Sequence, residues 1–253
     1  DHRYLHSYPT RRSSDLETQL KKYAELLVKT GINLKKDQIL VLRSPIECAE
    51  FARMIVEIGY DAGAKEVVVL WNDEICSKLT YLKAPDALFD TFPSYLKEFY
   101  LSYVRQDAAF LSISASDPEN LKDVDPVRIQ RYQRAFSAEV SEYRQRMMNN
   151  ENVWCVASVP TPKWASKVFP DDSVAVAMEK LWAAIFNAVR VNTPDPVEAW
   201  ESHKQNLKQQ MKVLNTYNFK TLHYTNTLGT DLSIELPEGH IWLGGSDFTP
   251  AGQ

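Results

Sequence analysis

Four short runs of apolar, mostly β-branched or aromatic residues recur along this chain, separated by long stretches with helical spacing. The runs are QILVLR (38–43), KEVVVLW (65–71), AAFLSIS from Ala108 onward, and NVWCVAS (152–158). Strands that alternate with helices predict an α/β fold, in which helices flank a parallel sheet and the crossovers are right-handed. Because KEVVVLW is continuous and β-branched, we expect it to be a central strand buried on both faces.

The stretches between these runs predict helices with recognisable ends. Leu16 to Val28 repeat at helical spacing, with Asp15 as a plausible N-cap and Gly31 as a stop. PIECAEFARMIVEIGYDAG reads as a helix that ends in glycine, and NDEICSKLTYLK opens another with Asn72 or Asp73 as its cap. Later helices are expected over Pro126 to about Asn149, over 172–190 with Asp171–Asp172 as the N-cap, and over 195–215.

The pattern changes after Tyr217, where three short strand-like runs follow one another. FKTLHYTN, TDLSIEL and HIWLGG are separated by turn residues, which is typical of antiparallel β structure. We therefore predict an α/β N-terminal domain over 16–216 and the truncated start of a β-rich domain over 217–253. About forty residues are too few to build a core of their own.

Residues 1–15, DHRYLHSYPTRRSSD, show no apolar periodicity and no apolar block of the kind a secretory signal carries. A disordered basic arm would look like this. The segment also resembles translated sequencing-adaptor sequence, so we treat it as non-native, expect it to be disordered and leave it out of the fold prediction.

Composition narrows the classes of function. The formal net charge of -4 argues against nucleic acid as a partner. No stretch approaches the roughly 18 apolar residues that span a bilayer, so no membrane partner is expected. The three cysteines, Cys48, Cys76 and Cys155, are widely separated and form no C-x-x-C pair. Buried thiols in a reducing cytoplasm are the expected reading.

Motifs for several common chemistries are missing. Glycine is absent between Gly63 and Gly229, so neither a dinucleotide fingerprint nor a phosphate loop can follow these strands. G-x-S-x-G is also absent, and Ser112, Ser114 and Ser116 have no histidine nearby in the sequence. For these serines we expect loop capping rather than catalysis.

The histidines outside the first fifteen residues are scattered. His203 lies in a polar helix, His223 alternates within a strand, and His240 follows Glu238 and Gly239. Glu238 and His240 could hold a metal only with a third ligand, which the sequence does not supply, so a structural role is expected for each histidine.

Longer stretches resemble a known family. VPTPKWASKVFPDDSVAVAMEKLWAAIFNAVRVNTPDPVEAWESH and FKTLHYTNTLGTDLSIELPEGHIWLGG look like segments of the aminopeptidase T, aminopeptidase S and PepS family of thermophilic-type metallo-aminopeptidases. LKKYAELLVKTGINLKKDQILVLRSP and YDAGAKEVVVLWND fit its N-terminal domain. The resemblance covers about Leu16 to Gln253, with the motifs in the family's order.

The resemblance implies an enzyme that removes N-terminal residues from peptides and forms homodimers. It implies two divalent ions (zinc, cobalt or magnesium), held by carboxylate, histidine and tyrosine ligands in a C-terminal domain, where they activate a water molecule. The family's first ligand motif follows GGSDFTPAG, so Glu235, Glu238 and Asp247 precede it. We therefore assign no catalytic, cofactor-binding or metal residue, and expect an inactive fragment. The alternative is a stand-alone α/β module for small-molecule binding or interaction, without catalysis.

Overall fold

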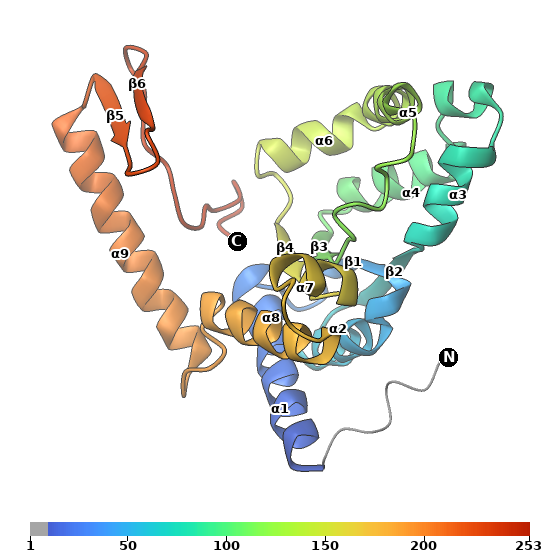
Figure 1. Ribbon diagram of the computed structural model, residues 1–253, viewed down its shortest axis with the longest axis horizontal. Helices are drawn as coiled ribbons and strands as arrows, with labels where there is room; N and C mark the ends of the chain where they lie inside the picture. Colours follow the sequence, from blue (N-terminus) through green and yellow to red (C-terminus); the bar gives the residue numbers. More distant parts are fainter. Residues whose placement is uncertain (1–9) are drawn as a thin grey trace. The chain divides into compact units, whose positions relative to one another are not determined.

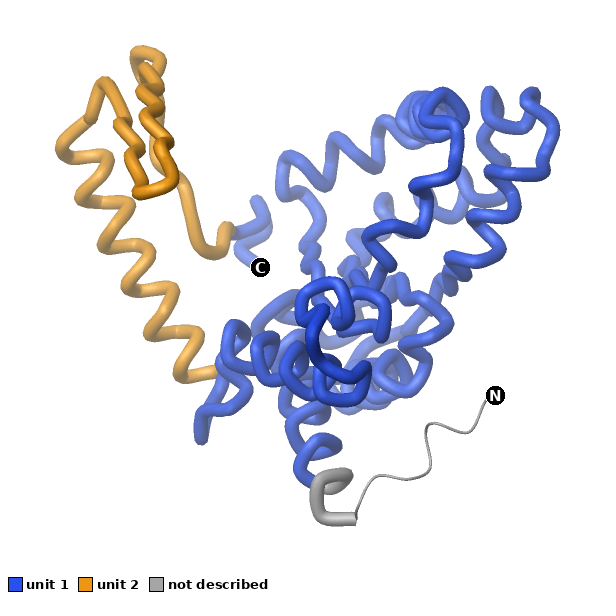
Figure 2. The backbone as a smooth tube through the Cα atoms, in the orientation of Figure 1, with its two compact units in different colours: residues 1–196, 248–253 blue, residues 197–247 orange. Residues whose placement is uncertain are grey.

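The computed structural model describes residues 10–253, with side chains from Asp15 onward. The chain divides into two compact units, coloured separately in Figure 2. One unit comprises residues 1–196 and 248–253, and the other comprises residues 197–247. The expected disorder of residues 1–9 lies outside the described residues.

The first unit is a parallel sheet with helices on both of its faces (Figure 1). Its strands are β1 Ile39–Pro45, β2 Glu66–Asn72, β3 Ala109–Ser114 and β4 Trp154–Ser158. Its α-helices are α1 Thr10–Leu26, α2 Ala49–Asp61, α3 Glu74–Lys83, α4 Ser94–Arg105, α5 Pro126–Glu139, α6 Ser141–Met148, α7 Pro162–Val168 and α8 Val174–Ala188. Shorter turns are η1 Leu27–Gly31, η2 Ile46–Cys48 and η3 Asp86–Asp90. The predicted α/β fold with a flanked parallel sheet is confirmed.

The sheet has the order β2-β1-β3-β4, and every pair in it is parallel. Alternate residues of β1 face opposite layers. Ile39 and Val41 pack with Val104 of α4 and Phe110 of β3, beneath aromatic residues of α4 and α6. Leu40 points to the other side, toward α2, where a Cβ added at Gly59 would lie 3.4 Å from its Cδ2. The core therefore forms two layers, one on each face of β1.

The expectation that KEVVVLW is the central strand is wrong. β2 lies at the edge of the sheet, and Val67 to Leu70 are only partly buried. The inner strands are β1 and β3, and β1, which pairs with β2 on one side and β3 on the other, is almost wholly buried. An apolar run shows that a strand packs against a helix, but it does not show how many neighbouring strands it has.

The long polar helix predicted from Pro126 is two helices. Val140 separates α5 from α6 with non-helical angles, φ -113° and ψ 31°, and its side chain is fully buried. The break lets the Val140 side chain point into the core while the helices on either side keep their polar faces in solvent. Polar composition alone could not locate the break.

Helix ends agree with the sequence at some positions and differ at others. Asp73 caps α3, accepting hydrogen bonds from the backbone N–H groups of residues 75 and 76 at 2.8 and 3.0 Å. Asp171–Asp172 does not cap α8; Ser173 does, and Asp172 pairs with Lys180 instead. Helix α1 begins at Thr10, so the disorder expected for residues 1–15 does not extend over residues 10–15. Adding residues to a helix that has already formed costs less free energy than nucleating a new one.

The helix ends at Gly31 as predicted, but glycine is not required there for a positive φ angle. Helix α1 passes into the wide turn η1, which ends at Gly31. A Cβ at Gly31 would lie 3.1 Å from the Cys155 sulfur, closer than a side chain normally tolerates. Glycine is needed here because β4 packs directly against the turn.

The second unit consists of most of α9 (Pro196–Tyr217), an antiparallel hairpin of β5 (Thr221–Thr225) and β6 (Asp231–Glu235), and the segment that follows. The unit begins earlier than the predicted boundary near Thr216, because α9 packs with the residues after the hairpin. HIWLGG was expected to form a third strand and does not. Asn215 of α9 accepts a hydrogen bond from the Trp242 N–H and donates one to the Trp242 carbonyl, at 2.8 and 3.0 Å.

The Tyr23 hydroxyl is buried in the first unit between two parts of the chain. Its ring stacks on Phe51 and meets Phe186 edge-on, and its hydroxyl exchanges hydrogen bonds of 3.2 Å with the backbone of Ser158. Burial raises the pKa of Tyr23 from 10.0 to about 12. Burial likewise raises the pKa of the Cys48 thiol from 9.0 to about 11.

These groups predict alkaline unfolding. Both hold their protons more tightly when folded, so the unfolded chain releases protons at lower pH and rising pH favours unfolding. The stabilisation is complete below pH 9 and is lost between pH 9 and about 12. For Tyr23 the loss reaches about 2 to 3 kcal/mol. Urea unfolding at several pH values measures it, and Tyr23→Phe should flatten the profile above pH 10. A stability that stays constant over this range would contradict the prediction.

Candidate functional site

Open parallel sheets bind ligands beyond the carboxyl ends of their strands, near the point where the strand order reverses. In this sheet the reversal occurs at β1, because the chain first adds β2 on one side and then β3 on the other. Two groups of side chains lie at the carboxyl ends. One is a set of ion pairs beyond β3, and the other is an aromatic cleft beside the ends of β1 and β2.

The ion pairs fasten the loop after β3 to the neighbouring helices. The Glu74 carboxylate accepts a hydrogen bond of 3.1 Å from the Asp117 backbone N–H. Lys163 lies 2.9 Å from the Asp117 carboxylate, and Lys167 pairs with Glu119. The hydrogen bond from Lys163 holds the pKa of Asp117 below its usual value. Asp117 and Glu119 both have basic partners, and the Glu74 carboxylate is held by the Asp117 backbone N–H, so these contacts fasten the loop.

The aromatic cleft is larger, with a volume of about 690 Å³. Its walls come from the ends of β1 and β2 and from α3, η3, α4 and α5. The lining residues are Arg43, Leu70, Trp71, Asn72, Ser77, Thr80, Tyr81, Leu88, Phe89, Thr91, Phe92, Pro93, Tyr95, Leu96, Tyr100, Tyr132, Gln133 and Phe136. A cleft of this size matches those that hold small molecules.

Arg43 was not singled out from the sequence. It lies near the carboxyl end of β1, and its side chain is exposed although its neighbours in the strand are buried. It forms a hydrogen bond with the Tyr143 hydroxyl, and its charge partly offsets the rise in the pKa of Tyr143 that burial causes. The signal in the sequence was a single arginine at the end of the apolar run QILVLR.

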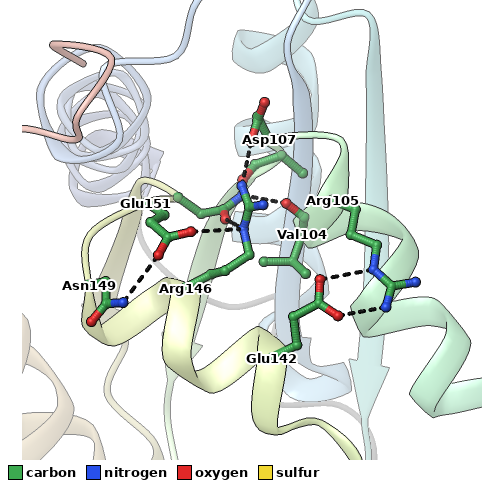
Figure 3. A network of polar contacts seen from close by, with 9 residues as sticks. Val104, Arg105, Asp107, Glu142, Arg146, Asn149 and Glu151 are labelled. Atoms are coloured by element: carbon green, nitrogen blue, oxygen red, sulfur yellow. Dashed lines mark hydrogen bonds and ion pairs between the residues drawn. The ribbon is translucent and has the colours of Figure 1, made fainter.

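A second polar network lies at the opposite, amino ends of the strands. Figure 3 shows Arg146 pointing to Asp107, at 2.6 Å, and to Glu151, at 3.7 Å. Beside it, Arg105 forms a two-pronged pair with Glu142 at 2.9 and 2.6 Å. These contacts tie α6 to the turn between α4 and β3.

Buried Asn152 completes this network. Its amide donates hydrogen bonds of 3.1 Å to the carbonyls of Val104 and Ala108, and its oxygen accepts one of 2.9 Å from Arg146. Gln253 is anchored nearby through an amide pair with Gln38, at 2.8 and 3.0 Å. The bonds of Asn152 join α4 and α6 to the segments that precede β3 and β4, so this network is structural.

The histidines considered from the sequence do not come together. His203 lies on α9 against Trp200. His223 pairs with Asp231 across the hairpin at 2.5 Å. His240 is 2.9 Å from the Pro237 carbonyl through Nδ1, and its buried Nε2 finds no hydrogen-bond partner in the described part of the chain.

The described residues do not fit the metal centre that the resemblance implies. Among residues 15–253, no group of three or more histidine, cysteine, aspartate or glutamate side chains could hold a metal ion. The hydroxyls of Ser112, Ser114 and Ser116 form no hydrogen bond with a histidine in the described residues, and the expected capping bonds are absent there too. None of the described helices has the length and apolarity to cross a membrane.

Comparison with known proteins decides the family. A family model described as "Thermophilic metalloprotease (M29)" matches residues 16–253. The chain belongs to the M29 family. It is 39% identical over 236 residues to aminopeptidase 2 of Geobacillus stearothermophilus, an alignment that covers 93% of this chain and 57% of the relative. It is 37% identical to aminopeptidase AmpS of Bacillus subtilis, over 92% of this chain and 57% of that relative.

A solved structure of an M29 relative has the same fold. The structure titled "Wild-type AmpT from Thermus thermophilus" matches with a TM-score of 0.83 and 33% identity, over 94% of this chain and 58% of that one. The resemblance to aminopeptidases T, S and PepS is thereby confirmed. The chain spans a little under three fifths of the length of these M29 relatives.

Proposed function

We propose that this chain is part of a metal-dependent aminopeptidase that removes N-terminal residues from peptides. The observation that supports the proposal is the M29 match over residues 16–253, together with curated relatives that are named as aminopeptidases. The peptide substrate, the two divalent ions and the homodimer implied by the resemblance belong to this proposal. We further propose that the metal ligands lie outside residues 1–253 and that the chain alone is inactive.

A chimera tests both parts of the proposal. Residues 16–253 are joined to the part of Geobacillus stearothermophilus aminopeptidase 2 that this chain does not match. With added zinc, cobalt or magnesium, the chimera should release p-nitroaniline from leucyl-p-nitroanilide, and EDTA should stop the reaction. The chain alone should show no release above the blank, and neither should the relative's unmatched part alone.

The two parts of the proposal fail in different ways. Metal-dependent hydrolysis by the chain alone would support the aminopeptidase activity but contradict the proposal that the metal ligands lie outside residues 1–253. A chimera that folds and dimerises but hydrolyses no aminoacyl p-nitroanilide would count against the function. Sedimentation of the chimera measures the homodimer separately.

A further inference from the structure

The aromatic cleft beside β1 and β2 has walls that are held in place before any ligand arrives. Tyr81 stacks on Phe89 with ring centroids 5.5 Å apart and meets Tyr132 edge-on at 6.1 Å. Phe136 meets Phe92 at 5.2 Å and Tyr100 at 5.8 Å. Rings in mutual contact lose little further freedom on binding, so the cleft is preorganised.

Ion pairs behind one wall fix it further. Arg128 lies over the Phe89 ring at 5.2 Å and pairs with Asp86 at 2.5 Å. Arg131 pairs with Asp90 at 2.5 Å. These contacts tie η3 to α5, both of which contribute residues to the lining of the cleft. The positive charges of these two arginines are therefore already matched by carboxylates.

Arg43 differs from those arginines. Among the residues that line the cleft it carries the only formal charge, and the lining contains no aspartate or glutamate. None of the ion pairs found among residues 15–253 includes Arg43; its polar contact is the neutral Tyr143 hydroxyl. An arginine on an inner strand, exposed to an aromatic cleft and without a carboxylate partner, is arranged to receive an anion.

We propose that this cleft binds an organic carboxylate with an aromatic or large apolar body, with Arg43 holding the carboxylate. The apolar body would lie against the rings of the walls, and Asn72 or Gln133 could supply further hydrogen bonds. A free amino acid fits less well, because the lining has no acid to match its ammonium group. The ligand chemistry is that of a peptide ending in an apolar residue, or of a small aromatic acid. The inference goes beyond the proposed hydrolysis and does not depend on it.

Isothermal titration calorimetry of this chain with N-acetyl-phenylalanine tests the proposal. We expect saturable binding with a Kd of about 1 mM or tighter. N-acetyl-phenylalaninamide, which differs only in lacking the charge, should bind roughly tenfold more weakly or worse. Free phenylalanine should also be weaker. This comparison uses the unaltered chain and does not depend on how any variant folds.

Variants then locate the binding. Arg43→Gln should weaken binding of N-acetyl-phenylalanine roughly tenfold or more and leave binding of the amide unchanged. Arg43→Lys should bind the acid with an affinity between those of the unaltered chain and Arg43→Gln. Leu96→Trp, which fills the cleft, should weaken acid and amide alike. Arg53→Gln is the matched control, since Arg53 is exposed on α2, on the opposite face of the sheet. Circular dichroism and thermal melts confirm that each variant is folded.

Two further ligands distinguish the sources of the carboxylate. Tighter binding of Ala-Ala-Phe than of 3-phenylpropionate would identify a peptide terminus, and the reverse order would identify a small acid. Either order supports the shared chemistry. Equal binding of acid and amide, unchanged binding by Arg43→Gln, or no saturation up to about 10 mM would overturn the proposal.

Discussion

Leu40→Ala should lower the free energy of unfolding by about 2 to 5 kcal/mol. Leu40 is fully buried near the amino end of β1, between Val67 of β2 and Ala109 of β3. Its side chain packs toward α2 at Gly59, where the helix approaches the sheet too closely to shift and fill a cavity. The loss of stability is large because the substitution removes the buried apolar contacts of the leucine side chain and also leaves a cavity. Urea unfolding followed by circular dichroism measures it.

Leu228→Ala provides the matched control. Leu228 lies in the turn of the hairpin and is 92% exposed, so the same chemical change should alter stability by less than about 0.5 kcal/mol. A loss below about 1 kcal/mol for Leu40→Ala would mean that α2 can close over the cavity. That outcome would contradict the tight packing described for this layer.

Asn152→Ala should cost about 3 kcal/mol, which is large for the loss of one polar side chain. The change removes both hydrogen bonds to the carbonyls of Val104 and Ala108 and the one from Arg146. Because Asn152 is buried, water cannot readily replace these bonds. We expect the turn between α4 and β3 to loosen first, which amide hydrogen exchange at Ala108 would detect.

Asn149→Ala is the control for this site. Asn149 is exposed in the neighbouring turn and donates one hydrogen bond of 3.1 Å to Glu151. Its loss should change stability by less than about 0.5 kcal/mol. If both asparagine variants lowered the free energy of unfolding by the same small amount, the hydrogen bonds of Asn152 would not stabilise the turn, and the prediction would be wrong.

The sequence predicted the fold class because strand and helix signals are local. Asp73 capped its helix, and the β-branched runs formed strands, since each depends on a few neighbouring residues. Which strand would be central depends on partners far along the chain, and KEVVVLW carries no information about them. The break at Val140 also depends on a core that only the folded chain contains.

The candidate site was harder to predict than the fold. The aromatic cleft draws residues from six separate elements, and no spacing in the sequence connects Arg43 with Tyr100 or Phe136. Family resemblance, by contrast, is carried by continuous stretches of the sequence, and the M29 match confirms it. The histidines were left unassigned as ligands because their positions in the sequence gave no cluster, and that assignment stays a prediction.

The order of the strands has a consequence for how the chain reaches this structure. β1 is synthesised early, yet its pairing with β3 must wait for more than sixty further residues, since Leu40 pairs with Ala109. Contacts so distant along the chain slow folding, because a long loop must close before they form. A nascent chain that has not yet reached β3 carries β1, which is almost wholly buried in the finished fold, with one edge open. This edge must therefore be protected from pairing with other chains during synthesis, although in the finished fold it is covered by β3.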